Sequence, residues 1–109
     1  MERIQSYEQL QQGIQKYPVV LVYVSSADCS VCYADYIKIT KMCEEMQYPA
    51  LTFDVNDVPE AAGQLNLFSL PAVVLYYQGK EYHRQARIID FHALEERMVQ
   101  LQQASLEAR

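Results

Sequence analysis

The chain has 109 residues, half of them hydrophobic, which is enough for the core of one domain over residues 1–109. Fourteen acidic side chains against nine lysines and arginines give a net charge of -5, so we expect repulsion of a phosphate backbone and no nucleic-acid partner. The longest strongly apolar run, residues 19–24, is too short to span a bilayer or to form the core of a signal peptide. We therefore expect no membrane partner and a cytoplasmic location.

The N-terminal part of the chain predicts a short helix followed by a buried strand. Ser6, with Gln9 three residues later, has the spacing of a capping box, and apolar residues at helical spacing follow until Tyr17-Pro18. Residues 19–24 are β-branched, aromatic or apolar at every position, which is typical of a central strand buried on both faces.

A second helix begins at a pair of cysteines, Cys29 and Cys32. Its apolar residues recur at spacings of four, three, four and three: Cys32, Tyr36, Ile39, Cys43 and Met46. The pattern stops by Tyr48-Pro49, and residues 50–55 predict a second strand. A strand-helix-strand unit implies a right-handed parallel crossover, so the pair follows the carboxyl end of a strand, the edge where open α/β sheets usually bind ligands.

The remaining sequence predicts a helix, a hairpin and a final helix. Residues 59–65 form a short helix with proline in its first turn, and residues 66–70 are irregular. A hairpin of residues 72–77 and 80–84 turns at Gln78-Gly79. Asp90 then caps a helix whose apolar face consists of Phe91, Leu94, Met98 and Leu101.

The spacing of the cysteine pair suits thiol-disulfide chemistry. Free backbone N–H groups and the positive end of the helix dipole favour the thiolate of Cys29, although the neighbouring Asp28 opposes it. Cys32 is one helical turn away and close enough to form a disulfide with Cys29. An odd number of cysteines with one close pair does not resemble a disulfide framework. The alternatives are two buried cysteines acting as small hydrophobic residues, or a metal site.

A zinc site needs four ligands, and beyond the pair only Cys43, His83 and His92 supply sulfur or nitrogen. Cys43 follows Cys32 by eleven residues, which is about 16 Å along a helix. The two histidines are nine residues apart, outside the usual zinc-finger spacing. We therefore expect no metal, interpret both histidines as surface or half-buried, and interpret Cys43 as a core residue, with regulatory oxidation or dimer formation as the alternative.

The order of the elements, the cysteine pair after a buried strand, and the segment from Leu70-Pro71 to Glu81 resemble the thioredoxin family over nearly the whole chain. The resemblance implies an α/β thioredoxin fold, with a mixed four- or five-stranded sheet flanked by helices. It also implies a cis Leu70-Pro71 bond facing the cysteines, with the backbone of Leu70 turned outward so that a substrate peptide adds as a strand. Protein disulfide substrates, a recycling reductase such as thioredoxin reductase, and no cofactor follow from the same resemblance.

Six positions depart from the family's most familiar form. Asp28 stands where the family has tryptophan, and Ser30-Val31 stand where it has Gly-Pro. Tyr23 replaces a buried acid that moves protons for the second thiol, which predicts slow resolution unless the Tyr23 hydroxyl forms a hydrogen bond near Cys32 and partly replaces the acid. Ile37 replaces a helix-kinking proline and Arg87 replaces a glycine. These departures favour a narrower range of partners than a general thioredoxin has.

Two functions are compatible with these residues. In the first, the chain is a thiol-disulfide oxidoreductase in which Cys29 is the nucleophile, Cys32 is the resolving thiol, and Leu70 and Pro71 bind the substrate. In the second, it is a redox-inactive binding module of the same fold that presents the Leu70-Pro71 edge to another protein. The sequence does not fix the direction of electron flow or the natural substrate.

Overall fold

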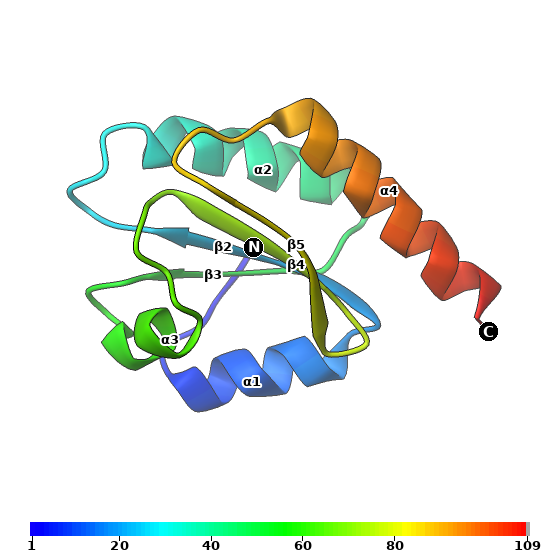
Figure 1. Cartoon of the computed structure of the whole chain (residues 1–109), viewed down its shortest axis with the longest axis horizontal. Helices are drawn as coiled ribbons and strands as arrows, with labels where there is room; N and C mark the ends of the chain where they lie inside the picture. Colours follow the sequence, from blue (N-terminus) through cyan, green and yellow to red (C-terminus); the bar gives the residue numbers. More distant parts are fainter. Residues whose placement is uncertain (109) are drawn as a thin grey trace.

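The structure is a computed structural model that describes residues 1–108; Arg109, the last residue of the predicted domain, lies outside the described residues. Its centre is a mixed five-stranded sheet in the order β1-β3-β2-β4-β5. Figure 1 labels the strands β2 to β5 of this sheet. In chain order the elements are β1 (Glu2–Arg3), α1 (Tyr7–Lys16), β2 (Val19–Ser25), α2 (Cys32–Met46), β3 (Ala50–Asp54), α3 (Pro59–Gln64), β4 (Ala72–Tyr77), β5 (Lys80–Ala86) and α4 (Phe91–Glu107).

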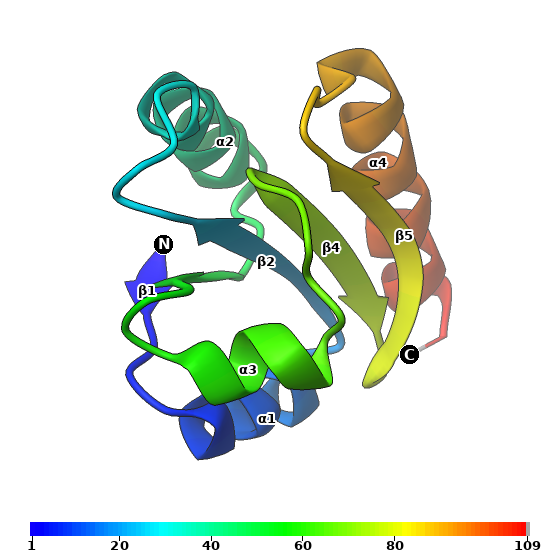
Figure 2. The same ribbon diagram turned by 60° about the vertical axis from the view of Figure 1, so that its left-hand side comes forward.

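Helices cover both faces of the sheet. Figure 2 shows α1 and α3 together on one face, opposite α2 and α4. Successive residues of β2 point to opposite faces, so Val20, Val22 and Val24 pack with α1 and α3, whereas Val19, Leu21 and Tyr23 pack with α2 and α4. Burial on both faces explains the continuous apolar run of this strand, as the sequence predicted.

Strand directions place the cysteine pair at one edge of the sheet. β2 runs parallel to β3, which runs parallel to β1, while β4 is antiparallel to β2 and β5 is antiparallel to β4. The carboxyl ends of β2 and β3 therefore lie side by side, and β4 begins beside the end of β2. The central strand consequently has β3 on one flank and β4 on the other.

Both predicted N-cap hydrogen bonds are confirmed, but the capping box is not complete, because the Gln9 side chain accepts from the Gln5 N–H at 2.7 Å rather than from the Ser6 N–H. The Ser6 hydroxyl accepts a hydrogen bond from the Gln9 N–H at 3.1 Å, and the Asp90 carboxylate accepts one from the Ala93 N–H at 3.0 Å. Each cap satisfies one of the backbone N–H groups that a helix start leaves unpaired. None of the helices within residues 1–108 is long and apolar enough to cross a membrane.

Four predicted boundaries shift by one or two residues, and one strand was missed. β2 ends at Ser25 rather than at residue 24, and α3 ends at Gln64 rather than at residue 65. β3 ends at Asp54 rather than at residue 55, and β5 continues to Ala86, two residues beyond the predicted end. The β1 strand was not predicted at all, because it has only two residues, both exposed, and so shows no alternation of apolar side chains. It exists through parallel pairing of Glu2 and Arg3 with the β3 residues Leu51 and Thr52.

Candidate active site at the carboxyl end of β2

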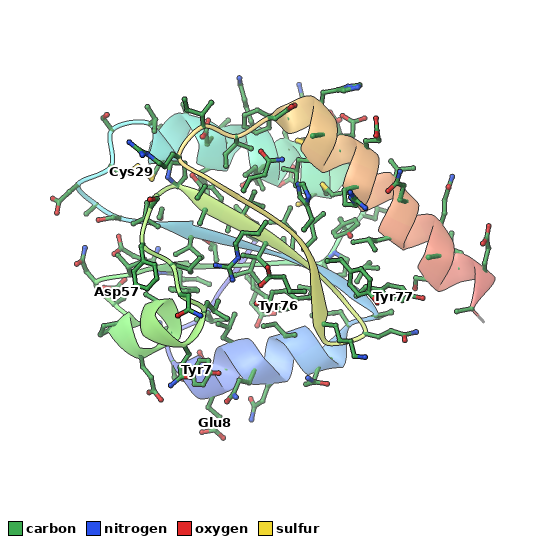
Figure 3. All side chains as sticks on the ribbon, viewed as in Figure 1. Tyr7, Glu8, Cys29, Asp57, Tyr76 and Tyr77 are labelled. Atoms are coloured by element: carbon green, nitrogen blue, oxygen red, sulfur yellow. A yellow bond between two sulfur atoms is a disulfide. The ribbon has the colours of Figure 1, made fainter. Side chains whose placement is uncertain are left out.

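Cys29 and Cys32 lie between the end of β2 and the first turn of α2. The backbone N–H of Cys29 donates to the Ser26 carbonyl at 3.1 Å, and that of Cys32 donates to the Cys29 carbonyl at 3.2 Å, which folds the segment into consecutive turns. The two sulfurs are joined in a disulfide, with the Cα atoms 5.4 Å apart. Figure 3 places Cys29 at the end of the molecule where β2 ends and α2 begins.

The two sulfur-bearing residues differ in accessibility. Cys29 is half-buried, whereas Cys32 is only 3% exposed because it begins the core-facing stripe of α2. Val31, the N-cap residue of α2, makes no side-chain hydrogen bond to the helix, so the helix begins beside the pair without a polar cap. Cys29 is therefore the sulfur that a large disulfide partner reaches first.

Tyr23 lies beneath the pair and is fully buried in the core shared with α2. Its hydroxyl donates a hydrogen bond to the backbone carbonyl of Cys32 at 2.6 Å, and its ring packs against Tyr36 with centroids 6.0 Å apart. Burial, followed by the negative charge of Asp35, raises the pKa of Tyr23 above its ordinary value. The predicted hydrogen bond near Cys32 thus exists, but it holds the first turn of α2 by its backbone and does not engage the thiol.

The segment that ends at Pro71 lies beside the cysteine pair on the β4 side of the site. The Leu70-Pro71 peptide bond is cis, and the pairing of Ala72 with Val24 places this segment beside the end of β2. Pro71 has no N–H, and within residues 1–108 the backbone of Leu70 takes part in no hydrogen bond to other backbone groups. Two strongly exposed apolar side chains come from neighbouring positions in the sequence. Phe68, two residues before Leu70, is 86% exposed, and Ile88, which follows Arg87, is 90% exposed.

Arg87 holds the Leu70-Pro71 segment in place. Its backbone N–H donates to the Pro71 carbonyl at 2.8 Å, and its φ of 74° lies in the left-handed region that favours glycine. The resemblance had identified this position as one where glycine is common, and the backbone conformation gives the physical reason. An arginine here costs about 1–3 kcal/mol in backbone strain relative to an ordinary conformation.

A cavity of about 330 Å³ opens on the opposite flank of the disulfide. Its wall includes both cysteines and residues from β1, β2, β3 and α2: Arg3, Ser25, Ser26, Ala27, Cys29, Cys32, Tyr33, Tyr36, Thr52, Phe53 and Asp54. Leu70 and Pro71 are not part of this wall. The disulfide is therefore flanked by an exposed edge on the β4 side and, on the β3 side, by a cavity with both polar and apolar lining residues.

The other candidate ligands lie outside the site. Cys43 is a free thiol, 5% exposed, and burial raises its pKa to about 11. His92 is exposed and lies 3.7 Å from Glu96, whereas His83 is half-buried and has a pKa lowered chiefly by desolvation. Within residues 1–108 no three histidine, cysteine or acidic side chains cluster as metal ligands would. The interpretation of Cys43 as a core residue is confirmed.

Comparisons with known proteins now identify the fold. No protein-family model matches the chain. Thioredoxin-like protein YdfQ of Bacillus subtilis (strain 168) is 27% identical over 101 residues, which cover 90% of this chain and 88% of that protein. The thioredoxin of Fasciola hepatica superposes with a TM-score of 0.85 at 20% identity, covering 93% of this chain and 99% of that one. The thioredoxin of Plasmodium falciparum superposes with a TM-score of 0.82 at 18% identity, covering 92% and 98%. The chain has the thioredoxin fold.

The resemblance seen in the sequence is thus confirmed, and the mixed sheet has five strands, the larger of the two predicted numbers. The thioredoxin-like fold, together with a cysteine pair at disulfide distance, supports thiol-disulfide oxidoreductase chemistry in general terms.

Sequence reasoning missed the cavity of this thioredoxin-like site. Arg3, Thr52 and Asp54 come from strands that are some fifty residues apart in the chain, and only the pairing of β1 with β3 brings them together. The one signal available was the end of the second predicted strand, because a polar Asp54 follows the buried residues of a parallel strand at the edge where ligands bind.

Proposed function

We propose that this protein is a thiol-disulfide oxidoreductase in which Cys29 is the nucleophile and Cys32 is the resolving thiol. One observation carries the proposal: a half-buried and a fully buried cysteine lie at disulfide distance between the end of a parallel strand and an uncapped helix start. That arrangement favours a thiolate at the accessible sulfur and keeps the second sulfur within reach for intramolecular attack.

In the reducing direction the reaction has two exchange steps. The Cys29 thiolate attacks one sulfur of a substrate disulfide, so a Cys29–substrate disulfide forms and the other substrate sulfur leaves as a thiolate that takes a proton. The Cys32 thiolate then attacks Cys29, which closes the protein disulfide and releases the second substrate sulfur. Two electrons pass from the protein to the substrate, and the reverse sequence oxidises a dithiol.

The substrate is proposed to be an extended peptide that lies along Leu70 and Pro71. The free backbone of Leu70 supports this assignment, because an added strand needs unpaired main-chain groups. The exposed side chains of Phe68 and Ile88 beside this edge support a protein partner, since apolar residues so exposed gain by being covered.

Further parts of the proposal rest on the family resemblance. They are a single thioredoxin-like domain over residues 1–109, protein disulfide substrates, a recycling reductase such as thioredoxin reductase, and a cytoplasmic role in redox homeostasis. Neither a cofactor nor a metal is needed for the two exchange steps. The natural substrate and the direction of electron flow are left to experiment.

The decisive test is a redox titration. The protein is equilibrated in graded dithiol buffers, free thiols are trapped by alkylation, and peptide mass identifies which cysteines changed state. We expect a reversible two-electron transition confined to Cys29 and Cys32, with Cys43 constant. A low midpoint would identify a reductant and a high midpoint an oxidant. A pair that never closes would instead support the redox-inactive binding module.

A second experiment distinguishes the oxidoreductase from the redox-inactive binding module by the protein partners that each would capture. Protein partners are captured with wild type and with Cys29→Ser. An oxidoreductase loses its covalently captured partners when the nucleophile is replaced, whereas a binding module that uses only the Leu70-Pro71 edge keeps them.

A further inference from the structure

The disulfide is flanked by two different surfaces, and the proposed peptide site uses only one of them. β2 lies between β4 and β3 in the sheet, so Leu70 and Pro71 approach the pair from the β4 side and the cavity opens on the β3 side. Both Cys29 and Cys32 line that cavity. A small molecule in it would therefore meet the sulfurs without competing for the Leu70 backbone.

The size of the cavity indicates a small occupant. Its volume of about 330 Å³ lies at the lower end of the range of roughly 300–1,000 Å³ that is typical of small-molecule sites. The lining residues from the end of β2 to the loop before Cys29 are small and leave space for an occupant: Ser25, Ser26 and Ala27.

The polar lining carries one charge of each sign. Arg3 donates through a single terminal nitrogen, Nη2, to Asp57 at 2.8 Å, and its other nitrogens make no hydrogen bond within residues 1–108. The Oδ1 atom of Asp54 accepts from the Asn56 N–H at 2.8 Å, which leaves Oδ2 free among the same residues. Figure 3 shows Cys29 and Asp57, the ion-pair partner of Arg3, at the same end of the molecule. A free guanidinium face and a free carboxylate oxygen match a carboxylate and an ammonium group.

We propose that this cavity binds a low-molecular-weight thiol that carries an amino-acid headgroup, and that such a thiol reduces the Cys29–Cys32 disulfide from the β3 side. The inference rests on the proposed function, because it gives the same cysteine pair a second, small-molecule reductant. The headgroup carboxylate pairs with Arg3, the ammonium pairs with Asp54, and the thiol faces the sulfurs.

The exchange balances with two molecules of the thiol. The first thiolate attacks Cys29, so a mixed disulfide forms and Cys32 leaves as a thiolate that takes a proton from water. A second thiolate attacks the ligand sulfur of the mixed disulfide, which yields the small-molecule disulfide and releases Cys29 as a thiolate. Two thiols are oxidised, and the protein disulfide gains two electrons.

The test compares four small thiols as reductants of the oxidised wild-type protein. Free L-cysteine carries both charges, cysteamine only the ammonium, 3-mercaptopropionate only the carboxylate, and 2-mercaptoethanol neither. Rates are corrected for the thiolate fraction and intrinsic nucleophilicity of each reagent. We expect L-cysteine to react with a saturable rate and about tenfold faster than 2-mercaptoethanol at low concentration, because two charged hydrogen bonds hold it.

Variants assign the effect to the cavity. Arg3→Gln and Asp54→Asn should each remove most of the preference for L-cysteine over 2-mercaptoethanol within the same variant. Ser25→Leu, which fills the space, should abolish saturation. Asp57→Asn controls for loss of the Arg3 ion pair, and Arg97→Gln on α4 makes the same charge change away from the cavity; both should keep the preference.

Two results would overturn the inference. One is a rate that rises linearly with every thiol and shows no preference after correction. The other is a preference that survives both Arg3→Gln and Asp54→Asn. If either result is accompanied by normal exchange between the dithiol protein and a peptide disulfide, the small-thiol site fails while the proposed function stands. If peptide exchange is also absent, the proposed function fails as well.

Discussion

The two ends of α2 each combine a cysteine with a buried tyrosine, but only the first end lies beside a sulfur that is partly exposed. At the first turn, Tyr23 donates to the Cys32 carbonyl, and Cys32 is joined to a half-buried Cys29. Near the last turn, Cys43 is a buried free thiol, and the Tyr48 hydroxyl is buried without a hydrogen-bond partner among the described residues. The difference shows that position relative to a strand end and a helix start, rather than residue type, decides which sulfur is accessible, and accessibility is one condition for the proposed chemistry.

The largest expected effect comes from replacing the cysteines one at a time. Cys29→Ser should lower the rate of exchange with a peptide disulfide at least roughly 100-fold, because a hydroxyl does not supply a thiolate-like nucleophile at neutral pH. Cys32→Ser should keep the first step but accumulate a mixed disulfide on Cys29. The measurement is thiol release from the peptide, with mass spectrometry of the trapped species.

Cys43→Ser is the matched control, because it makes the same atomic change at the other end of α2. It should leave the exchange rate within about twofold, since the buried thiol faces no substrate. A comparable loss of exchange in Cys43→Ser would contradict the contrast between the two ends.

The second prediction concerns the pH dependence of stability. Burial raises the pKa of Cys43 from 9.0 to about 11, so above pH 9 the unfolded chain loses this proton while the folded chain keeps it. The contribution is fully present below pH 9 and is lost as the pH rises to about 11, at a cost of about 2 kcal/mol in the free energy of unfolding. Urea unfolding of the oxidised protein at pH 7, 9, 10 and 11 measures it.

Cys43→Ala isolates this effect from the raised tyrosine pKa values, which also weaken the fold at high pH. The variant should start from a lower stability at pH 7, because it leaves a small cavity, but should fall less steeply between pH 9 and 11. Parallel curves for the two proteins would refute a buried, protonated Cys43.

The third prediction tests the hydrogen bond under the cysteine pair. Tyr23→Phe removes the donor to the Cys32 carbonyl and should lower the free energy of unfolding by about 1–2 kcal/mol. Because the first turn of α2 is then held less firmly, resolution of the mixed disulfide by Cys32 should slow a few-fold. Denaturant unfolding and the decay of a preformed mixed disulfide measure the two effects.

Tyr36→Phe serves as the control, since it removes a hydroxyl from the aromatic ring that packs on Tyr23 while both rings remain. It should change stability by less than about 0.5 kcal/mol. If Tyr23→Phe resolves mixed disulfides as fast as Tyr36→Phe does, Tyr23 has only a packing role.

Local sequence patterns predicted most of this fold, because the spacing of apolar residues in each helix or strand depends on which of its faces is buried in the core. The continuous apolar run of β2, the helical stripe from Cys32 and the two polar caps each have a local physical cause. The β1 strand and the cavity were missed because they depend on contacts between distant segments, above all between Arg3 and the β3 strand. The Tyr23 hydrogen bond was expected near Cys32, but its acceptor, a carbonyl rather than the thiol, required the structure.

The smallest expected effect has the opposite sign and comes from Tyr48→Phe. The Tyr48 hydroxyl loses its water on folding and gains no hydrogen bond within residues 1–108, so removing it should raise the free energy of unfolding by up to about 1 kcal/mol. Tyr23→Phe deletes the same atom at the other end of α2 and should lower that free energy. Urea unfolding of both variants at pH 7, where both tyrosines are protonated, compares them directly. Equal losses of stability would mean that Tyr48 has a polar partner after all, and that the two ends of α2 are held in the same way.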